Sequence, residues 1–289
     1  MAGRITQQSI SNVALRGLQA NLTRMQKLQE AVSSGKKISQ PSDDPSGTAA
    51  AMTLRSRRAA DDQYLRNIDL GSGRLAITDT ALGQLSERLT AVRNLVIESR
   101  NGSLGSDSQG AIAAQITAIK GEVVDLYNTT YLGRPVFGGT TPGNAAINTD
   151  GEYKGDDNPV QMRISADAVV RVDVGGKAVG ADALPGILDS VAAHVTDGTV
   201  GDQDLQDIDG VMAKLSQSIG DLGAREKRVE TTRAMVESHQ LDLTSRISLS
   251  EDIDLPEAMM TLASAQLGYQ AALQSAAKIQ QNSLMDFLK

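Results

Sequence analysis

The chain lacks cysteine and tryptophan, and it has only two phenylalanines and five tyrosines among 289 residues. Without cysteine there is no disulfide, no thiolate nucleophile and no cysteine-ligated metal. Large aromatic side chains usually fill thick globular cores, so their scarcity argues against one thick core. The apolar residues that are present suit thin seams between helices.

Excess positive charge and long apolar runs are also missing. The formal charge of -7 and the pI near 5.0 argue against a nucleic-acid partner, because binding to phosphates depends on clustered Lys and Arg. No run of about 18 apolar residues occurs, so we expect no membrane partner. The largely polar segment 1–12 does not look like a cleaved secretion signal, which predicts that any export proceeds without cleavage.

Both ends of the chain have apolar residues on a seven-residue repeat, which predicts coiled-coil helices. The N-terminal stripe comprises Leu15, Leu18, Leu22, Met25 and Val32, with Gln29 as its polar interruption. The C-terminal stripe comprises Met259, Leu262, Gln266, Tyr269, Leu273, Ala276 and Gln280. Neither stripe has enough large side chains to hold a helix folded alone, so we expect the ends to pair with each other and with neighbouring subunits.

Local signals place the breaks between helices. Gly35 can end the first helix in a left-handed conformation, and Asp44 can cap a second helix that has Pro45 at its first position. Asp43 stands beside them in the same turn. Regular three- and four-residue spacings predict helices from Thr48 to about Arg100 and over 111–130.

The composition changes between about 133 and 201, where Gly, Pro, Asp, Thr and Val predominate. Two stretches, Val160–Ile164 and Ala168–Val174, are typical of strands, and Gly175-Gly176 is expected to form a turn. A short helix is expected over Leu184–Val195. A long helix is expected over about 202–249, and the regular apolar spacing from Leu205 to Ile247, some forty residues at 1.5 Å each, accounts for roughly 60 Å of it.

No constellation of residues predicts catalysis, a cofactor or a metal. An EF-hand loop counted from Asp202 would need Gly at position 207 and Glu at 213, but the chain has Asp207 and Ala213. The acidic run of Asp202, Asp204, Asp207 and Asp209 is therefore expected to stabilise a helix N-terminus. The two histidines, His194 and His239, have no Ser, Asp or His at triad or ligand spacing and are expected to be solvated or lightly packed.

Several blocks along the chain are distinctive: Arg4-Ile5-Thr6, Leu15–Gln19, Ser34–Ile38, Pro41–Pro45, Gly133–Gly139, Tyr153–Asp156, Gln161–Ile164, Asp252–Ala258 and Ser283–Leu288. These blocks resemble the flagellin superfamily of bacterial flagellar axial proteins, and within it the proteins that join hook to filament. Two residues depart from the pattern: Pro135 replaces an aromatic residue or Leu, and Pro256 replaces an acidic or small residue.

The resemblance implies a secreted structural subunit of the extracellular flagellum, exported by the type III apparatus and assembled into a ring at the hook–filament junction. Its implied partners are copies of itself, another hook-associated protein, flagellin and an export chaperone. The predicted fold is mainly α: a long antiparallel coiled-coil or helical-bundle rod with paired terminal helices and a small β-containing insert. Its predicted domains are 1–45 with 250–289, ordered on assembly; 46–135 with 201–249; and the insert 136–200.

The residues expected to form the assembly interface are Leu15, Leu18, Leu22, Met25, Met259, Leu262, Tyr269, Leu273 and Phe287. The helix-capping turn is expected at Asp43, Asp44 and Pro45. Three alternatives remain open. Flagellin shares the end helices, a non-flagellar coiled-coil adaptor shares the helical repeats, and an enzyme would need a polar pocket in the insert.

Overall fold

Long helices make up most of the described chain. The computed structural model describes residues 2–100, 105–148, 150–156 and 158–287, with no side chain described for 2–8, 10, 11 or 279–287. The helices are α1 (Ala2–Ser34), α2 (Pro45–Ser99), α3 (Ser106–Tyr127), α4 (Leu184–Asp197), α5 (Asp202–Glu251) and α6 (Leu255–Phe287). The predicted mainly helical class with a small β-containing insert is confirmed.

By packing, the chain forms two compact units. The first joins residues 1–59 to 240–289, and the second comprises residues 60–239. The boundaries between these two units fall inside α2 and α5. The three domains expected from the sequence instead have their boundaries near residues 45, 135, 200 and 249. That three-part division stays a prediction.

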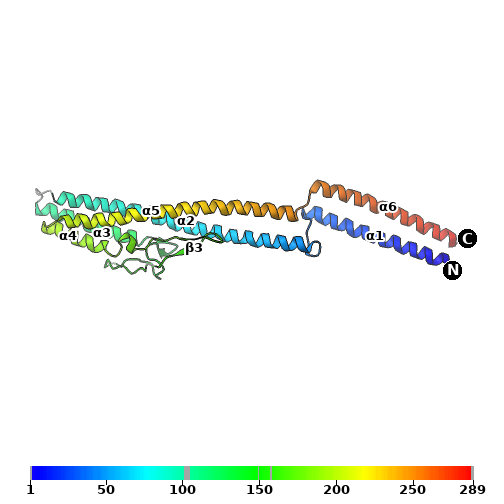
Figure 1. Ribbon diagram of the computed structural model, residues 1–289, viewed down its shortest axis with the longest axis horizontal. Helices are drawn as coiled ribbons and strands as arrows, with labels where there is room; N and C mark the ends of the chain where they lie inside the picture. The colour runs from blue at the N-terminus through cyan, green and yellow to red at the C-terminus, as the bar shows by residue number, and fades with distance from the viewer. Residues whose placement is uncertain (1, 101–104, 149, 157, 288–289) are drawn as a thin grey trace. The chain divides into compact units, whose positions relative to one another are not determined.

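In the first unit, α1 packs along α6, and the two chain ends lie at the same end of this antiparallel pair (Figure 1, blue and orange-red). Gly35 has a φ of +71°, a left-handed conformation that glycine adopts without strain, so α1 ends at Ser34. The helix α2 then begins at Pro45, as its fixed φ favours.

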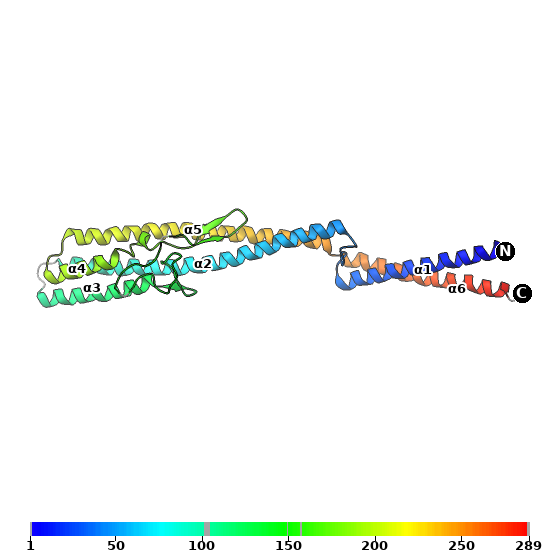
Figure 2. The same cartoon turned by 90° about the horizontal axis from the view of Figure 1, so that it is seen from below.

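In the second unit, α2 and α5 run antiparallel. Arg93 on α2 forms an ion pair with Asp209 on α5 at 2.7 Å, and Asp69 pairs with Arg233 at 2.5 Å. The helices α3 and α4 lie side by side (Figure 2), with Lys120 and Asp189 joined at 2.6 Å. One apolar core, which includes Leu82, Leu89, Ile116, Leu188, Leu215 and Leu222, runs through these four helices.

Segment 128–183 between α3 and α4 packs onto the same core. It holds two antiparallel hairpins, β1 (Thr130–Tyr131) with β2 (Arg134–Pro135), and β3 (Gln161–Arg163) with β4 (Val169–Arg171). Tyr127 and Phe137 meet edge to face with ring centroids 5.7 Å apart, and the Tyr127 hydroxyl donates to the Val179 carbonyl at 2.7 Å. The segment is therefore anchored through the last residue of α3.

The two strands of the second hairpin were predicted, though not their pairing, and they are shorter than the stretches 160–164 and 168–174. Gly175 and Gly176 begin a turn, as expected, in which the Ala178 amide donates to the Gly175 carbonyl at 3.1 Å, and this turn continues into a 3-10 helix, Lys177–Val179. The first hairpin was missed, since strands of two residues are too short to show an alternating pattern. The helix expected at Leu184–Val195 is confirmed and extends to Asp197.

Candidate assembly surface

The facing sides of α1 and α6 combine large side chains with small ones. On α1 the half-buried residues recur every three or four positions, at Ala14, Leu18, Leu22, Met25, Leu28 and Val32. On α6 the half-buried residues are Ala258, Thr261, Leu262, Ala265, Tyr269, Ala272 and Ala276. Leu and Met side chains of α1 therefore pack mostly against a row of alanines on α6.

The predicted interface residues divide into two groups. Leu18, Leu22, Met25, Leu262 and Tyr269 are half-buried in the pair. Three others are exposed by large fractions: Leu15 by 48%, Met259 by 60% and Leu273 by 44%. The side chain of Phe287 lies outside the described residues.

The stripe expected on α6 agrees with the half-buried face at Leu262, Tyr269 and Ala276, but two of its positions are shifted by one residue. It included Gln266 and Leu273, both of which are exposed, whereas Ala265 and Ala272 are half-buried. The shift arises because the larger side chains were taken to mark the inner face, while small residues allow two helix backbones to approach closely. Leu28 was missed on α1 for a related reason, since the strict repeat selected Gln29 instead.

The exposed apolar side chains of α6 lie on its flank and outer face. Besides Met259 and Leu273, they include Met260 and Leu267, which are each 69% exposed. At about 100° per residue, Met260 and Leu267 point away from the alanine row, one above the other. The pair thus buries one face of α6 and leaves other apolar surface uncovered.

The other end of the helix pair is closed where two chain segments cross. The amide of Lys37 donates to the Glu251 carbonyl at 2.7 Å, and the amide of Ile253 donates to the Gly35 carbonyl at 3.0 Å. The Glu251 carboxylate is buried, and it pairs with Lys36 at 3.2 Å and with Arg55 at 2.6 Å. We call residues 35–37, Arg55 and 251–253 the crossover clamp.

The two acidic residues of the predicted capping turn have different roles. Asp44 caps α2, since its Oδ1 accepts from the Gly47 amide at 2.9 Å, and this bond lowers the pKa of Asp44. Asp43 instead pairs with Lys27 on α1 at 3.1 Å, and this hydrogen bond lowers the pKa of Asp43. The turn is therefore joined to α1 as well as to α2.

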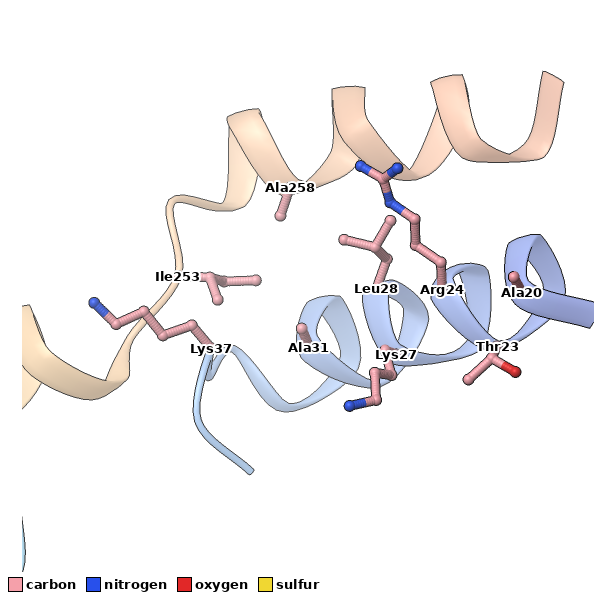
Figure 3. Close-up of a pocket in the computed structure, with 9 residues that line it drawn as sticks. All are labelled: Ala20, Thr23, Arg24, Lys27, Leu28, Ala31, Lys37, Ile253 and Ala258. Atoms are coloured by element: carbon pink, nitrogen blue, oxygen red, sulfur yellow. The ribbon is translucent and has the colours of Figure 1, made fainter. Parts of the chain in front are cut away.

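A groove of about 660 Å³ lies between α1 and α6 beside the crossover clamp. Its lining is mostly apolar, and in Figure 3 Leu28 and Ala258 point toward one another from the two helices, with Ile253 at one end. Arg24, Lys27 and Lys37 also line it. The groove is suited to an apolar side chain that has a carboxylate beside it.

Both histidines are exposed, as expected, but each has a carboxylate partner that sequence spacing did not predict. His194 lies 2.7 Å from Asp204, and His239 lies 2.7 Å from Asp61, measured from Nδ1 to the carboxylate oxygen. Both aspartates are buried. Asp204, expected to stabilise a helix N-terminus, also accepts from the Gly201 amide at 2.9 Å before the first turn of α5.

The described residues contain no group of three or more His, Asp or Glu side chains that could hold a metal ion. None of the helices, over the part of each that is described, is long and apolar enough to cross a membrane.

The helical regions at both ends match a known family. The N-terminal helical region of bacterial flagellin matches residues 5–141, and its C-terminal helical region matches residues 205–288. These matches cover most of the chain, and the protein belongs to the flagellin superfamily of structural flagellar proteins.

Individual relatives fall into two groups. The chain is 23% identical over 273 residues to flagellar hook-associated protein 3 of Escherichia coli, an alignment that covers 90% of this chain and 83% of the relative. It is 24% identical to a flagellin of Halalkalibacterium halodurans, over 86% of this chain and 85% of the relative. A putative flagellar hook-associated protein from Vibrio parahaemolyticus has the same fold, with a TM-score of 0.67, 20% identity and coverage of 72% of this chain and 99% of that one.

Proposed function

We propose that this protein is a hook-associated junction protein that joins the flagellar hook to the flagellin filament. The observation that carries the proposal is the alignment with flagellar hook-associated protein 3 over 90% of this chain and 83% of that relative. Membership of the flagellin superfamily removes the non-flagellar adaptor from consideration. It leaves the filament subunit as the second candidate, because flagellins align over a similar share of the chain.

The paired terminal helices supply the means of assembly. A fully buried Leu or Met side chain contributes about 1.5 to 3 kcal/mol, and the large residues on the α1 face are only half-buried in the pair. The exposed residues Leu15, Met259 and Leu273 offer further apolar surface that a neighbouring subunit can cover. Copies of the chain, packed side by side as a ring, bury what a single copy leaves in water.

The partners follow from that position in the flagellum. One side of the ring meets another hook-associated protein, and the other side meets flagellin. The chain reaches this site by type III export, held by a chaperone that covers the apolar faces of α1 and α6 before assembly. Its place is extracellular, at the hook–filament junction.

Electron microscopy with gold-labelled antibody distinguishes the two candidates. Label confined to one point between hook and filament supports the junction protein, whereas label along the filament supports the filament subunit. In cells that lack the gene, a junction protein leaves hooks without filaments and flagellin in the medium. Cells that keep attached filaments after the deletion would refute the junction role.

A further inference from the structure

The turn of the first hairpin has an unusual residue in an unusual conformation. A two-residue loop, Leu132-Gly133, joins β1 to β2, and both residues have positive φ, +50° and +76°. Such a turn favours Asn-Gly or Asp-Gly, because both central residues adopt a left-handed conformation. Among the described residues, Leu132 is the only one other than glycine with positive φ.

Leu132 is also exposed to water. Leu132 is 76% exposed, and among the large apolar residues that the structure describes only Leu249 is more exposed, at 77%. The rest of the hairpin is held firmly: the Tyr131 hydroxyl lies against Gly73 of α2, and the Arg74 guanidinium donates to the Pro135 and Val136 carbonyls at 3.2 and 3.3 Å. A rigid hairpin thus presents an apolar side chain in a strained turn, a combination found where a residue makes a contact.

The residue that follows the turn adds a positive charge. Arg134 is exposed, and within the described part of the chain it has no carboxylate partner. The tip therefore presents a leucine and a guanidinium side by side. A complementary site would have an apolar floor and a carboxylate at its edge.

The same unit of the chain carries a groove with these properties. It lies between α4 and the first turns of α5, measures about 630 Å³, and has Ala183, Ile187 and Val191 among its apolar lining residues. Asp204 and Asp207 also line it. The Asp204 carboxylate is already paired with His194. Among the hydrogen bonds that the structure describes, the Asp207 carboxylate accepts only from the Gln203 side chain, one turn before it on α5.

We propose that the Leu132 tip of one copy docks into the α4–α5 groove of a second copy, with Arg134 beside Asp207. The groove between α1 and α6 does not suit this tip, because Arg24, Lys27 and Lys37 would repel Arg134. A copy does not fill its own groove, since Leu132 is exposed to water. The contact is head-to-tail, and contacts of this kind close into rings or continue as helices.

The proposal rests on the proposed function only in requiring that copies assemble, and it holds for a ring or for a filament. The absence of cysteine from the wild-type chain makes thiol cross-linking in assembled flagella specific. In cells that make Leu132→Cys copies together with Ser190→Cys copies, a short bis-maleimide gives dimers. Chains that carry both substitutions give a ladder of higher oligomers, because each copy uses its tip and its groove.

Leu132→Cys alone gives no cross-link. Met235→Cys combined with Ser190→Cys is the matched control: Met235 is 60% exposed in the same unit, but it lies outside the proposed contact and gives no cross-link. Dimers from Leu132→Cys alone would show a symmetric contact and overturn the proposal. Attached filaments that give no cross-link from the double variant would overturn it as well, while leaving the junction role intact.

A charge exchange tests the pairing independently of the cysteine positions. With the cross-linking cysteines present, Arg134→Glu or Asp207→Arg alone lowers the yield by roughly tenfold, and the two together restore it. Leu132→Asn separates the contact from folding: it relieves the strained backbone and raises Tm by roughly 2–4 °C, yet it reduces filament attachment. The control variant Met235→Gln changes neither Tm nor filament attachment. The proposal is wrong if the double exchange, Arg134→Glu with Asp207→Arg, does not restore the cross-linking yield. It is also wrong if the Leu132→Asn variant attaches filaments normally.

Discussion

Glu251 provides a quantitative test of how the crossover clamp holds the terminal helices. Its side chain is only 7% exposed, while those of its partners, Lys36 and Arg55, are 42% and 53% exposed. Glu251→Gln keeps the volume and removes the charge. A hydrogen bond to a charged group contributes about 1.5–3 kcal/mol. Because Lys36 and Arg55 are both partly solvated, we expect the two ion pairs together to contribute about 1.5–3 kcal/mol, and Glu251→Gln to lose that amount of stability.

The loss appears as local opening of the clamp. The amides of Lys37 and Ile253 are hydrogen-bonded across it, at 2.7 and 3.0 Å. A loss of 1.5–3 kcal/mol lowers their protection against hydrogen exchange by about 10- to 150-fold, since each 1.4 kcal/mol is a factor of ten. Exchange in the core of the second unit, at Leu82 for example, stays unchanged.

Glu30→Gln is the matched control. Glu30 is exposed on α1 in the same unit and has no ion-pair partner among the described residues, so its substitution removes an equal charge without touching the clamp. Equal protection of Lys37 and Ile253 in the two variants would refute the reasoning. It would mean that the backbone bonds hold the crossing without the buried carboxylate.

Three further predictions concern assembly, the core and pH. Leu273→Asp abolishes filament attachment in microscopy, because a neighbouring subunit would have to bury an unpaired charge, and the melting of the second unit stays unchanged. Tyr127→Phe costs about 1–2 kcal/mol and lowers Tm by roughly 2–8 °C, because a buried carbonyl loses its donor. The pKa of Asp156 is lowered from 3.8 to about 2 by its hydrogen bonds with Thr140, so this carboxylate stabilises the fold at neutral pH, and its contribution is lost as the pH falls from about 4 to 2.

Each of these predictions has its own control. Gln274→Asp adds the same charge beside Leu273 at an exposed polar position, and an equal loss of filaments in both variants would point to a general effect of charge on α6. An unchanged Tm in Tyr127→Phe would show that the Val179 carbonyl finds another donor. For Asp156, carboxylate NMR titration measures the pKa directly, and a value near 3.8 would exclude the hydrogen bonds with Thr140.

The helices and their ends could be predicted from the sequence, because their signals are local. Gly35 and the Asp44-Pro45 pair act within a few residues of themselves: α1 ends at Ser34, immediately before Gly35, and α2 begins at Pro45. The apolar repeats at both ends predicted that the terminal helices would need a partner. Together with the resemblance, they also led to the family.

Only the tertiary structure decided which side chains meet. Local spacing selected Gln266 and Leu273 on α6, but close packing against the Leu and Met side chains of α1 favours the smaller Ala265 and Ala272. His239 and Asp61 are 178 residues apart, so no spacing rule could pair them. The conformation of Leu132 is local to the hairpin, but the position of that hairpin is not, because Arg74 on α2 holds the carbonyls of Pro135 and Val136 from about 60 residues away in the chain.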